Sequence, residues 1–196
     1  TYESVAIGCD AGNLMLQQST AMGYTAGASS SEIGFTAIGY QAGTNVGSYS
    51  TTVGYQAGKD LVDDYSVCLG YRAGYNSSGS SSVWLGRNAG VSASSSTNTI
   101  GIGLDAGKSS SATDCIYIGD SAGESNSTDN LIFIANASPS SNGTLIKGDM
   151  ENKRLAIGVA DVTLDDTLFI GINSANDEGV VVKSAVSQVS NLTSWK

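Results

Sequence analysis

Four tyrosines, each placed directly after a glycine, are the side chains best suited to recognise a ligand. Tyr24, Tyr40, Tyr55 and Tyr71 recur at intervals of 15 or 16 residues. In stacked repeats they would lie about 4.8 Å apart, and the apolar faces of exposed tyrosine rings can stack on sugar rings. Alternatively, the rings pack in a turn or in a groove between chains, with only their hydroxyls in solvent. The four tyrosines are therefore candidate glycan-binding residues.

The residues that could support catalysis are few. None of the 196 residues is histidine, which excludes histidine-ligated zinc and Ser-His-Asp triads. A glycosidase needs two facing carboxylates about 5–10 Å apart, whereas Asp105 and Asp120 occupy different positions in neighbouring repeats. Asp60, Asp63 and Asp64 could offer oxygen ligands to calcium, although a solvated turn is the simpler interpretation. We expect no enzyme activity, no cofactor and no bound metal.

The net charge of the chain limits the classes of partner that it can bind. A net charge of −9 argues against nucleic acids and anionic membranes, because both attract basic surfaces. No apolar stretch approaches the roughly 20 residues that span a bilayer. We therefore expect no nucleic-acid partner and no membrane insertion. A neutral or weakly charged glycan is favoured over a phosphate-rich one, although Arg72 and Arg87 could form a local anion patch.

A repeat dominates residues 1–138. An apolar residue, a glycine, two variable residues and Ala-Gly recur eight times, at intervals of 15 to 17 residues. The copies are IGCDAG (7–12), MGYTAG (22–27), IGYQAG (38–43), VGYQAG (53–58), LGYRAG (69–74), LGRNAG (85–90), IGLDAG (102–107) and IGDSAG (118–123). LIFIANAS at 131–138 is interpreted as a degenerate ninth copy.

The repeat length predicts an all-β solenoid. Alternating residues with β-branched side chains before each glycine are typical of a strand, and paired glycines indicate a tight turn. Sixteen residues hold two strands of about five residues and two turns. Nine such coils, here called rungs, would stack to roughly 40 Å. We expect a parallel β-roll.

Alternation assigns the positions of each strand to two faces. The residue before each glycine and the residue two places earlier, such as Ile102 and Ile100, are expected to face the interior. The column between them, from Ala6 through Trp84 to Phe133, is also mostly apolar and is expected on the outside. Other copies of the chain would cover it, so a closed homo-oligomer is expected, with Trp84 at the interface.

A threonine ladder raises ice binding as a third functional class. Thr20, Thr36 and Thr51 occupy one column in successive repeats. The ladder is only three residues long, and the same alternation places it on the interior face. We therefore do not expect an ice-binding surface.

The repeats resemble a known group of fibrous proteins. SVAIG (4–8), FTAIGYQAG (35–43) and NTIGIGLDAG (98–107) are similar to repeats in heads of trimeric autotransporter adhesins. They resemble still more the repeats of trimeric phage tail fibres and fibre-like adhesins, because of their Tyr-x-Ala-Gly turns. The resemblance covers about residues 2–135. It implies a left-handed parallel β-roll, a homotrimer, and attachment to a cell-surface glycan or receptor by an extracellular or virion fibre. The alternative is a structural spacer without a ligand site.

Residues 139–196 form a second region. Pro139, the only proline, marks the boundary, and the polar segment 148–153 predicts a hairpin loop. The region resembles the β-rich segment upstream of the self-cleaving chaperone domain of endosialidase-type phage fibres. Trp195 would be either a trimer plug or an exposed contact at a fibre tip. As the distal end of a fibre meets its target, this region is expected to hold the binding site, with the tyrosines of the roll as the alternative.

The three cysteines are expected to be unpaired. Cys9, Cys68 and Cys115 lie at different positions of rungs one, five and eight. Three rungs separate their closest pair by about 14 Å, beyond the roughly 7 Å that a disulfide spans. All three are interpreted as small apolar filler.

Overall fold

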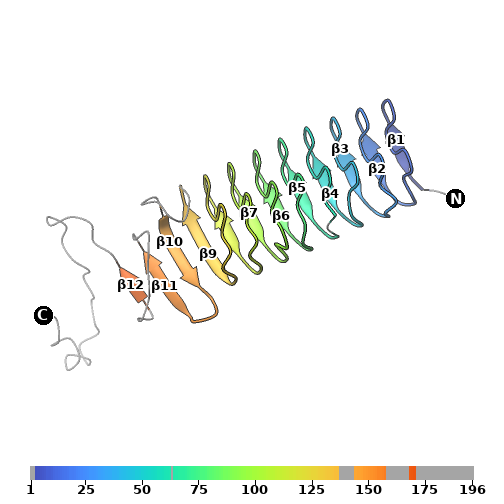
Figure 1. The fold of residues 1–196 in the computed structure, drawn as a ribbon. Helices are drawn as coiled ribbons and strands as arrows, with labels where there is room; N and C mark the ends of the chain where they lie inside the picture. The colour runs from blue at the N-terminus through green and yellow to red at the C-terminus, as the bar shows by residue number, and fades with distance from the viewer. Residues whose placement is uncertain (1–2, 63, 137–143, 158–167, 171–196) are drawn as a thin grey trace, which may run out of the picture.

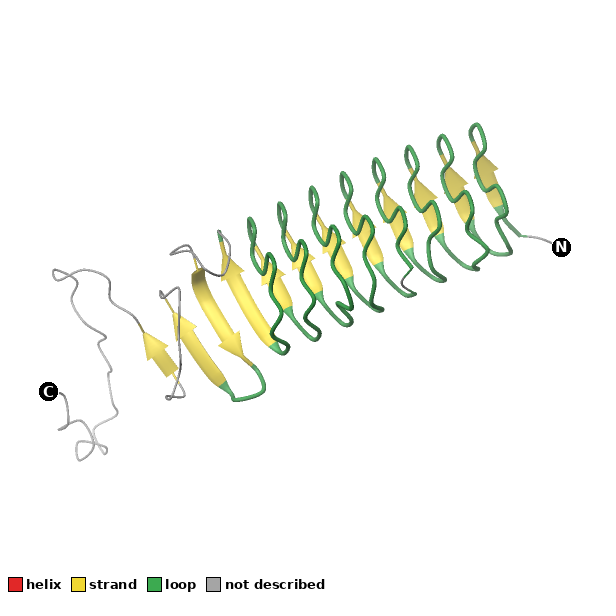
Figure 2. Cartoon of the chain, viewed as in Figure 1, coloured by secondary structure: helices red, strands yellow, loops and turns green. Residues whose placement is uncertain are grey.

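The structure is a computed structural model that describes residues 3–62, 64–136, 144–157 and 168–170. Within these ranges it contains twelve strands in one sheet and no helix (Figure 1). The strands follow one another in chain order, and the rungs stack into a rod (Figure 2). This confirms the all-β solenoid. Pro139, Asp63 and Trp195 lie outside the described residues, as does the expected boundary between residues 138 and 139.

Each repeat contributes one short strand. Neighbouring strands pair in parallel without a shift in register, so that Thr36 lies beside Thr51 and Ile38 beside Val53. The first eight strands are β1 (Val5–Ile7), β2 (Thr20–Met22), β3 (Thr36–Ile38), β4 (Thr51–Val53), β5 (Val67–Leu69), β6 (Val83–Leu85), β7 (Ile100–Ile102) and β8 (Ile116–Ile118).

The expectation of two strands in each rung is wrong. The other side of the rung is a series of turns in which alternate residues take a left-handed backbone, such as Gln56 (φ 53°), Gly58 (φ 58°) and Asp60 (φ 57°). These turns still hydrogen-bond between rungs. The Gln56 amide donates to the carbonyl of Tyr40, and the Gly58 amide to that of Ala73, both at 2.8 Å. The turns therefore satisfy their backbone groups as a sheet does, without strand geometry.

The glycines of the repeat are required by the close approach of neighbouring backbones. Gly54 has φ 136°, and a Cβ atom there would lie 2.3 Å from the carbonyl oxygen of Gly70 in the next rung. Gly58 has φ 58°, and its Cβ would lie 2.2 Å from Cγ2 of Thr52 across the interior. Ala57, beside it, is fully buried. The first glycine thus permits stacking, and the Ala-Gly pair forms the opposite wall of a narrow core.

The interior was assigned to the wrong face of the strand. Ala37, the middle residue of β3, is completely buried, whereas Ile38 beside it is 38% exposed. With only three residues in a strand, one side chain points inward and its two neighbours point outward. The buried middle column consists of Ala21, Ala37, Thr52, Cys68, Trp84, Gly101, Tyr117 and Phe133.

Trp84 is an interior residue. The expectation from the sequence, which placed it at an interface between chains, is wrong. It is fully buried, and its ring occupies space in the next rung as well. A Cβ atom at Gly101 would lie 2.5 Å from Cε3 of Trp84, and one at Gly107 would lie 2.5 Å from Cζ3. A glycine at position 101 of the middle column is therefore what makes room for the indole.

A row of buried serines, here called the serine ladder, lies at the edge of the core. Ser50, Ser66 and Ser82 precede successive strands and are buried. The amide of Ser66 donates to Oγ of Ser50 at 3.1 Å, and the amide of Ser82 donates to Oγ of Ser66 at 3.2 Å. The amide of Thr99 continues the series by donating to Oγ of Ser82 at 3.3 Å. This ladder, which the sequence did not reveal, satisfies backbone groups between strand and turn.

The far end of the sheet changes from parallel to antiparallel. Strand β9 (Leu131–Ala135) pairs in parallel with β8, which confirms the ninth copy. Strands β10 (Thr144–Asp149) and β11 (Arg154–Ile157) then form the expected hairpin, and β12 (Leu168–Ile170) pairs with β11. The Asp149 carboxylate accepts bonds from the amide and side chain of Asn152, which hold the pKa of Asp149 below its usual value.

Candidate binding surface

The four predicted tyrosines form an exposed stack, here called the tyrosine ladder. Ring centroids of Tyr24, Tyr40, Tyr55 and Tyr71 lie 5.2, 5.0 and 5.2 Å apart in sequence order, with interplanar angles of 11°, 7° and 7°. Each side chain is 43–49% exposed. The row follows from the in-register stacking of the glycine that precedes each tyrosine. The expected stack is confirmed, and its role in ligand binding stays a prediction.

The stacking changes how a ligand would meet these rings. Nearly parallel rings with centroids about 5 Å apart are offset-stacked, so that each face is partly covered by its neighbour. Tyr40 and Tyr55 have a tyrosine on both sides. The ladder therefore offers ring edges and a row of hydroxyls more than free faces. This geometry favours hydrogen bonding along the row over the stacking of sugars on ring faces.

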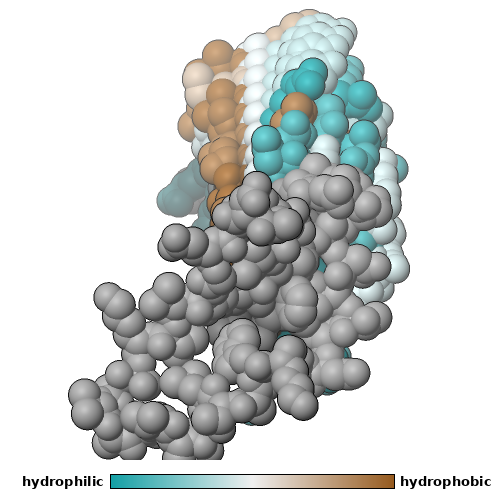
Figure 3. Space-filling view, turned by 90° about the vertical axis from the view of Figure 1, so that its left-hand side faces the viewer, coloured by the Kyte–Doolittle hydropathy of each residue, from teal (hydrophilic) through white to brown (hydrophobic). Residues whose placement is uncertain are grey.

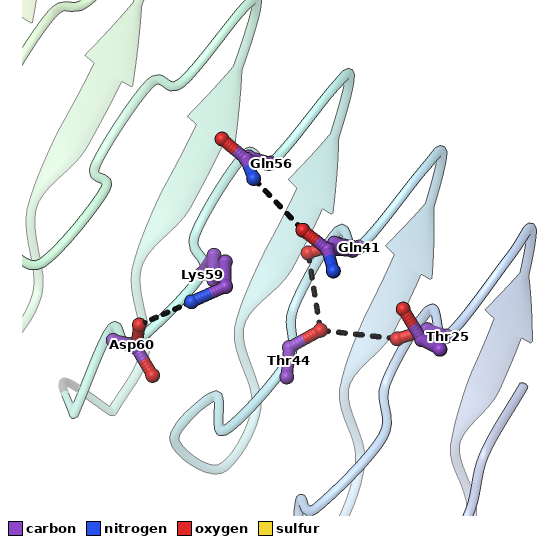
Figure 4. A network of polar contacts seen from close by, with 6 residues as sticks. All are labelled: Thr25, Gln41, Thr44, Gln56, Lys59 and Asp60. Carbon is purple, nitrogen blue, oxygen red and sulfur yellow. Dashed lines mark hydrogen bonds and ion pairs between the residues drawn. The ribbon is translucent and has the colours of Figure 1, made fainter. Parts of the chain in front are cut away.

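A polar row lies beside the ladder, because an uncharged polar residue follows each of its first three tyrosines. Nε2 of Gln56 donates to Oε1 of Gln41 at 2.8 Å (Figure 4). Oγ1 of Thr44 donates to the carbonyls of Thr25, at 3.0 Å, and Gln41, at 3.2 Å. These bonds tie neighbouring rungs together and fix the side chains next to the rings.

Two cations border the polar row, and both are engaged. Nζ of Lys59 lies 2.7 Å from Oδ2 of Asp60, and this hydrogen bond raises the pKa of Lys59 (Figure 4). The guanidinium of Arg72 lies over the ring of Tyr75, with its carbon 4.2 Å from the ring centroid. Cation–π contact of this kind holds the Arg72 side chain against the roll.

A second tyrosine pair was missed in the sequence. Tyr49 and Tyr65 stack at 5.3 Å with an interplanar angle of 9°, and Tyr65 is 61% exposed. Both have positive φ, 56° and 59°, which costs a bulky residue about 1–2 kcal/mol. The ring of Tyr49 lies over Gly34, where a Cβ atom would come within 2.7 Å of Cδ1. Their common distance, two residues before a strand, was the signal that could have identified them.

The outer face of the sheet is apolar. The first and third residues of each strand from β2 to β8 point outward and are exposed or half-buried, and all of them except Thr20, Thr36 and Thr51 are apolar; we call these apolar residues the apolar stripe. Leu85 and Ile102 belong to it, so the expectation that Ile102 is interior is wrong. Figure 3 shows the stripe as a continuous brown band along the roll, beside white and teal surface. Thr20, Thr36 and Thr51 also lie on this outward face and not inside.

Several acidic residues of the described part of the chain are held by neighbouring side chains and amides. Asp60 pairs with Lys59, and Asp64 accepts the amide of Ser48 at 2.7 Å. Asp105 accepts Nδ2 of Asn88 at 2.9 Å. Among the described residues, no group of three or more Asp, Glu, Cys or His side chains could hold a metal ion.

The cysteines lie in two kinds of surroundings. Cys68 and Cys115 are buried, as expected of filler, and burial raises the pKa of the Cys115 thiol. Cys9 is exposed, so the filler interpretation is wrong there. Its neighbour Asp10, through its charge, raises the pKa of the Cys9 thiol.

Comparison of the chain with protein-family models, curated proteins and solved structures finds no match. In the described ranges, no helix is long and apolar enough to cross a membrane. Two surfaces of the roll are therefore the candidates for a function: the tyrosine ladder and the apolar stripe.

Proposed function

We propose that the chain is part of a homotrimeric, non-catalytic fibre that attaches to a glycan or receptor on a cell surface. The fibre would act outside the cell or on a virion. The observation that carries the proposal is the apolar stripe, which is exposed in a single chain and runs along the whole roll. The resemblance of the repeats to trimeric fibres supports the number of chains.

The dimensions of the stripe support assembly. From β2 to β8 the stripe covers six steps of about 4.8 Å, which make it roughly 30 Å long. Monomeric proteins rarely expose contiguous apolar patches above a few hundred Å², and larger patches mark interaction surfaces. Three rolls arranged side by side around a common axis would turn their stripes toward that axis and bury them. Burial contributes about 25 cal/mol per Å² of apolar surface.

The tyrosine ladder favours attachment over the alternative of a structural spacer. A spacer needs only a soluble outer surface, whereas this surface carries six tyrosines in two exposed stacks. Tyrosine combines an apolar ring with a hydroxyl that hydrogen-bonds, and it is enriched in binding interfaces. The tyrosines of the ladder follow strands β2 to β5, each one glycine beyond the last residue of its strand.

Assembly can be tested by light scattering. The wild-type protein in solution should have three times the 19.9 kDa mass of one chain. The double variant Leu85→Asp/Ile102→Asp should give smaller species, because it places two charges in the apolar stripe. Ser109→Asp, an exposed position on the turn side, is the matched control and should leave the trimer intact. A folded wild-type monomer would refute the assembly proposal.

Attachment can be tested by labelling the full chain with a fluorescent dye and measuring its binding to a panel of bacterial and eukaryotic cells. We expect saturable binding to some cell types, which removal of surface glycans reduces. A trimer that binds no cell type in the panel would favour the spacer.

A further inference from the structure

We propose that the tyrosine ladder is a linear track for an uncharged β-1,4-linked glycan, with one sugar unit on each rung. The glycan would lie parallel to the long axis of the roll and be held by hydrogen bonds to the phenol hydroxyls. This inference rests on the proposed attachment function, and it names the class of ligand and the way it is bound.

The spacing of the ladder carries the inference. Successive ring centroids are separated by 5.0–5.2 Å over four rungs. An extended β-1,4-linked chain of pyranose sugars advances by nearly the same distance with each unit, whereas α-1,4-linked chains coil. Each phenol can both donate and accept a hydrogen bond, as can the hydroxyls of a sugar. Successive sugars of a β-1,4 chain can therefore meet successive tyrosines without a mismatch that grows along the row.

The charges near the ladder favour an uncharged ligand. The residues after its first three tyrosines, Thr25, Gln41 and Gln56, are uncharged, and the partly exposed side chains of Gln41 and Gln56 offer amide groups, whereas Oγ1 of Thr25 is buried. Lys59 and Asp60 neutralise each other through their 2.7 Å contact. The net charge of −9 opposes binding of a polyanionic glycan.

The track is already ordered before a ligand arrives. The amide of Gln41 donates to the carbonyl of Tyr24 and that of Gln56 to the carbonyl of Tyr40, both at 2.8 Å. The amide of Arg72 donates to the carbonyl of Tyr55 at 2.9 Å. Stacking holds the rings in one orientation, and half of each ring is covered. A ligand would therefore lose little affinity to the ordering of side chains.

The ladder has defined ends. Cys9 takes the position of the tyrosine in the rung before Tyr24, and Arg87 takes it in the rung after Tyr71. Four consecutive rungs offer a phenol, so the track matches four sugar units. This length distinguishes the proposal from recognition of a single terminal sugar.

Isothermal titration calorimetry of the full chain tests the proposal. The probes are glucose oligomers and N-acetylglucosamine oligomers, both β-1,4-linked, with one to six units. We expect the affinity for at least one series to rise with each unit up to four and then to level off. Glucose oligomers with α-1,4 linkage and the same number of units are the control, and they should show no such rise.

Removal of single phenol hydroxyls tests whether the tyrosines of the ladder hydrogen-bond to the glycan. Tyr40→Phe and Tyr55→Phe should each weaken binding of the tetramer about threefold to tenfold, the value of one hydrogen bond. Tyr65→Phe makes the same change in the second stack and should leave binding unchanged. Thermal melting of each variant shows whether the roll is intact.

Three results would overturn the track: no binding of either β-1,4 series, an affinity independent of chain length, or equal affinity for the α-1,4 series. If oligomers fail to bind while the fluorescent chain still attaches to cells, the track is wrong and the attachment proposal stands. If oligomers bind in the expected way and no cell is bound, the attachment proposal fails and the track stands.

Discussion

Most aromatic residues of the two halves of the roll lie on opposite sides of the same backbone; the exception is Phe35, which precedes β3 in the first half and is buried. From β2 to β5 the middle column holds Ala21, Ala37, Thr52 and Cys68, and tyrosines stack on the outside. From β6 to β9 the middle column holds Trp84, Tyr117 and Phe133, which are buried. The outer column of that half, after each glycine, contains Arg87, Leu104 and Asp120.

The two halves share the same backbone path, but different side chains fill the interior of their rungs. Where the middle residue is Thr52, the opposite wall supplies Val46 and Leu61, both buried. Where the middle residue is Tyr117, the opposite wall supplies Ser110, whose Oγ lies 3.0 Å from the phenol oxygen. A large residue on one side is thus matched by a small one on the other. Both halves depend on the same stacked glycines.

The largest effect is expected at those glycines. Gly54→Ala would place a methyl group 2.3 Å from the carbonyl oxygen of Gly70, at a φ of 136° that side chains rarely adopt. Since the obstacle is backbone, we expect a loss of at least about 4 kcal/mol in unfolding free energy. Chemical denaturation measures it. Gly148→Ala is the control, because its φ is ordinary and its Cβ would meet Ile132 at 3.3 Å. Equal stabilities of the two variants would contradict the stacking argument.

The next effect tests the filling of the core in the second half. Trp84→Ala should cost about 3–5 kcal/mol, because it leaves a cavity in a narrow core. Gly101→Ala alone should cost about 1–3 kcal/mol, since its methyl group would press on the indole ring. In the double variant the added methyl group should partly fill the space and recover stability. Strictly additive losses in this double-mutant cycle would show that the two residues do not share one space.

A smaller effect concerns Tyr117, whose hydroxyl accepts Nδ2 of Asn126 at 2.8 Å. Burial raises the pKa of Tyr117 well above its usual value of about 10. The folded state therefore binds the proton more tightly than the unfolded state, and stability should fall as the pH rises above about 10. Tyr117→Phe should cost about 1–2 kcal/mol at neutral pH, because Ser110 and Asn126 each lose one hydrogen bond in a buried site.

Denaturation from pH 8 to 11 checks this prediction. The alkaline loss of stability should be shallower in Tyr117→Phe than in the wild type. The matched variant Tyr55→Phe, at an exposed position of the first half, should keep the wild-type slope. Identical slopes in all three proteins would mean that Tyr117 is not buried.

The smallest effect is expected on the outside of the first half. Tyr55→Ala removes a ring that is 45% exposed and stacks on two others. Stacked aromatic pairs contribute about 0.5–1.5 kcal/mol each, and the low end applies to rings that are nearly half exposed, so we expect the two pairs to give a loss near 1 kcal/mol, far below that of Trp84→Ala. Thermal melting in the same buffer compares the two. A loss as large as that of Trp84→Ala would show that the ladder is part of the core.

The repeat and the parallel stacking of rungs could be predicted from the sequence, because glycines at a constant interval leave few other folds. The hairpin around residues 150–153 could also be predicted from its polar residues between apolar segments. The stacked tyrosines followed from their common place after each glycine.

The side of the strand that faces inward could not be predicted from alternation. Ile38 and Ile102 look like core residues, and in a strand of three residues the apolar type alone does not identify the buried face. Size was the better guide, because the small residues Ala21 and Ala37 fit a narrow core, as does Gly101 beside Trp84. The serine ladder was not predicted, because a small polar residue gives no apolar signal of burial, although Ser50, Ser66 and Ser82 recur at intervals of 16 residues.

The central claim is that the middle residue of each strand lies inside and its neighbours lie outside. Ala37→Asp and Ile38→Asp place the same charge at adjacent positions on opposite faces, so circular dichroism on heating tests the claim most directly. We predict that Ala37→Asp loses the β-sheet signal or melts far below the wild type, because it buries an unpaired carboxylate. Ile38→Asp should keep the signal and melt much closer to the wild type. A folded Ala37→Asp variant together with an unfolded Ile38→Asp variant would contradict this account.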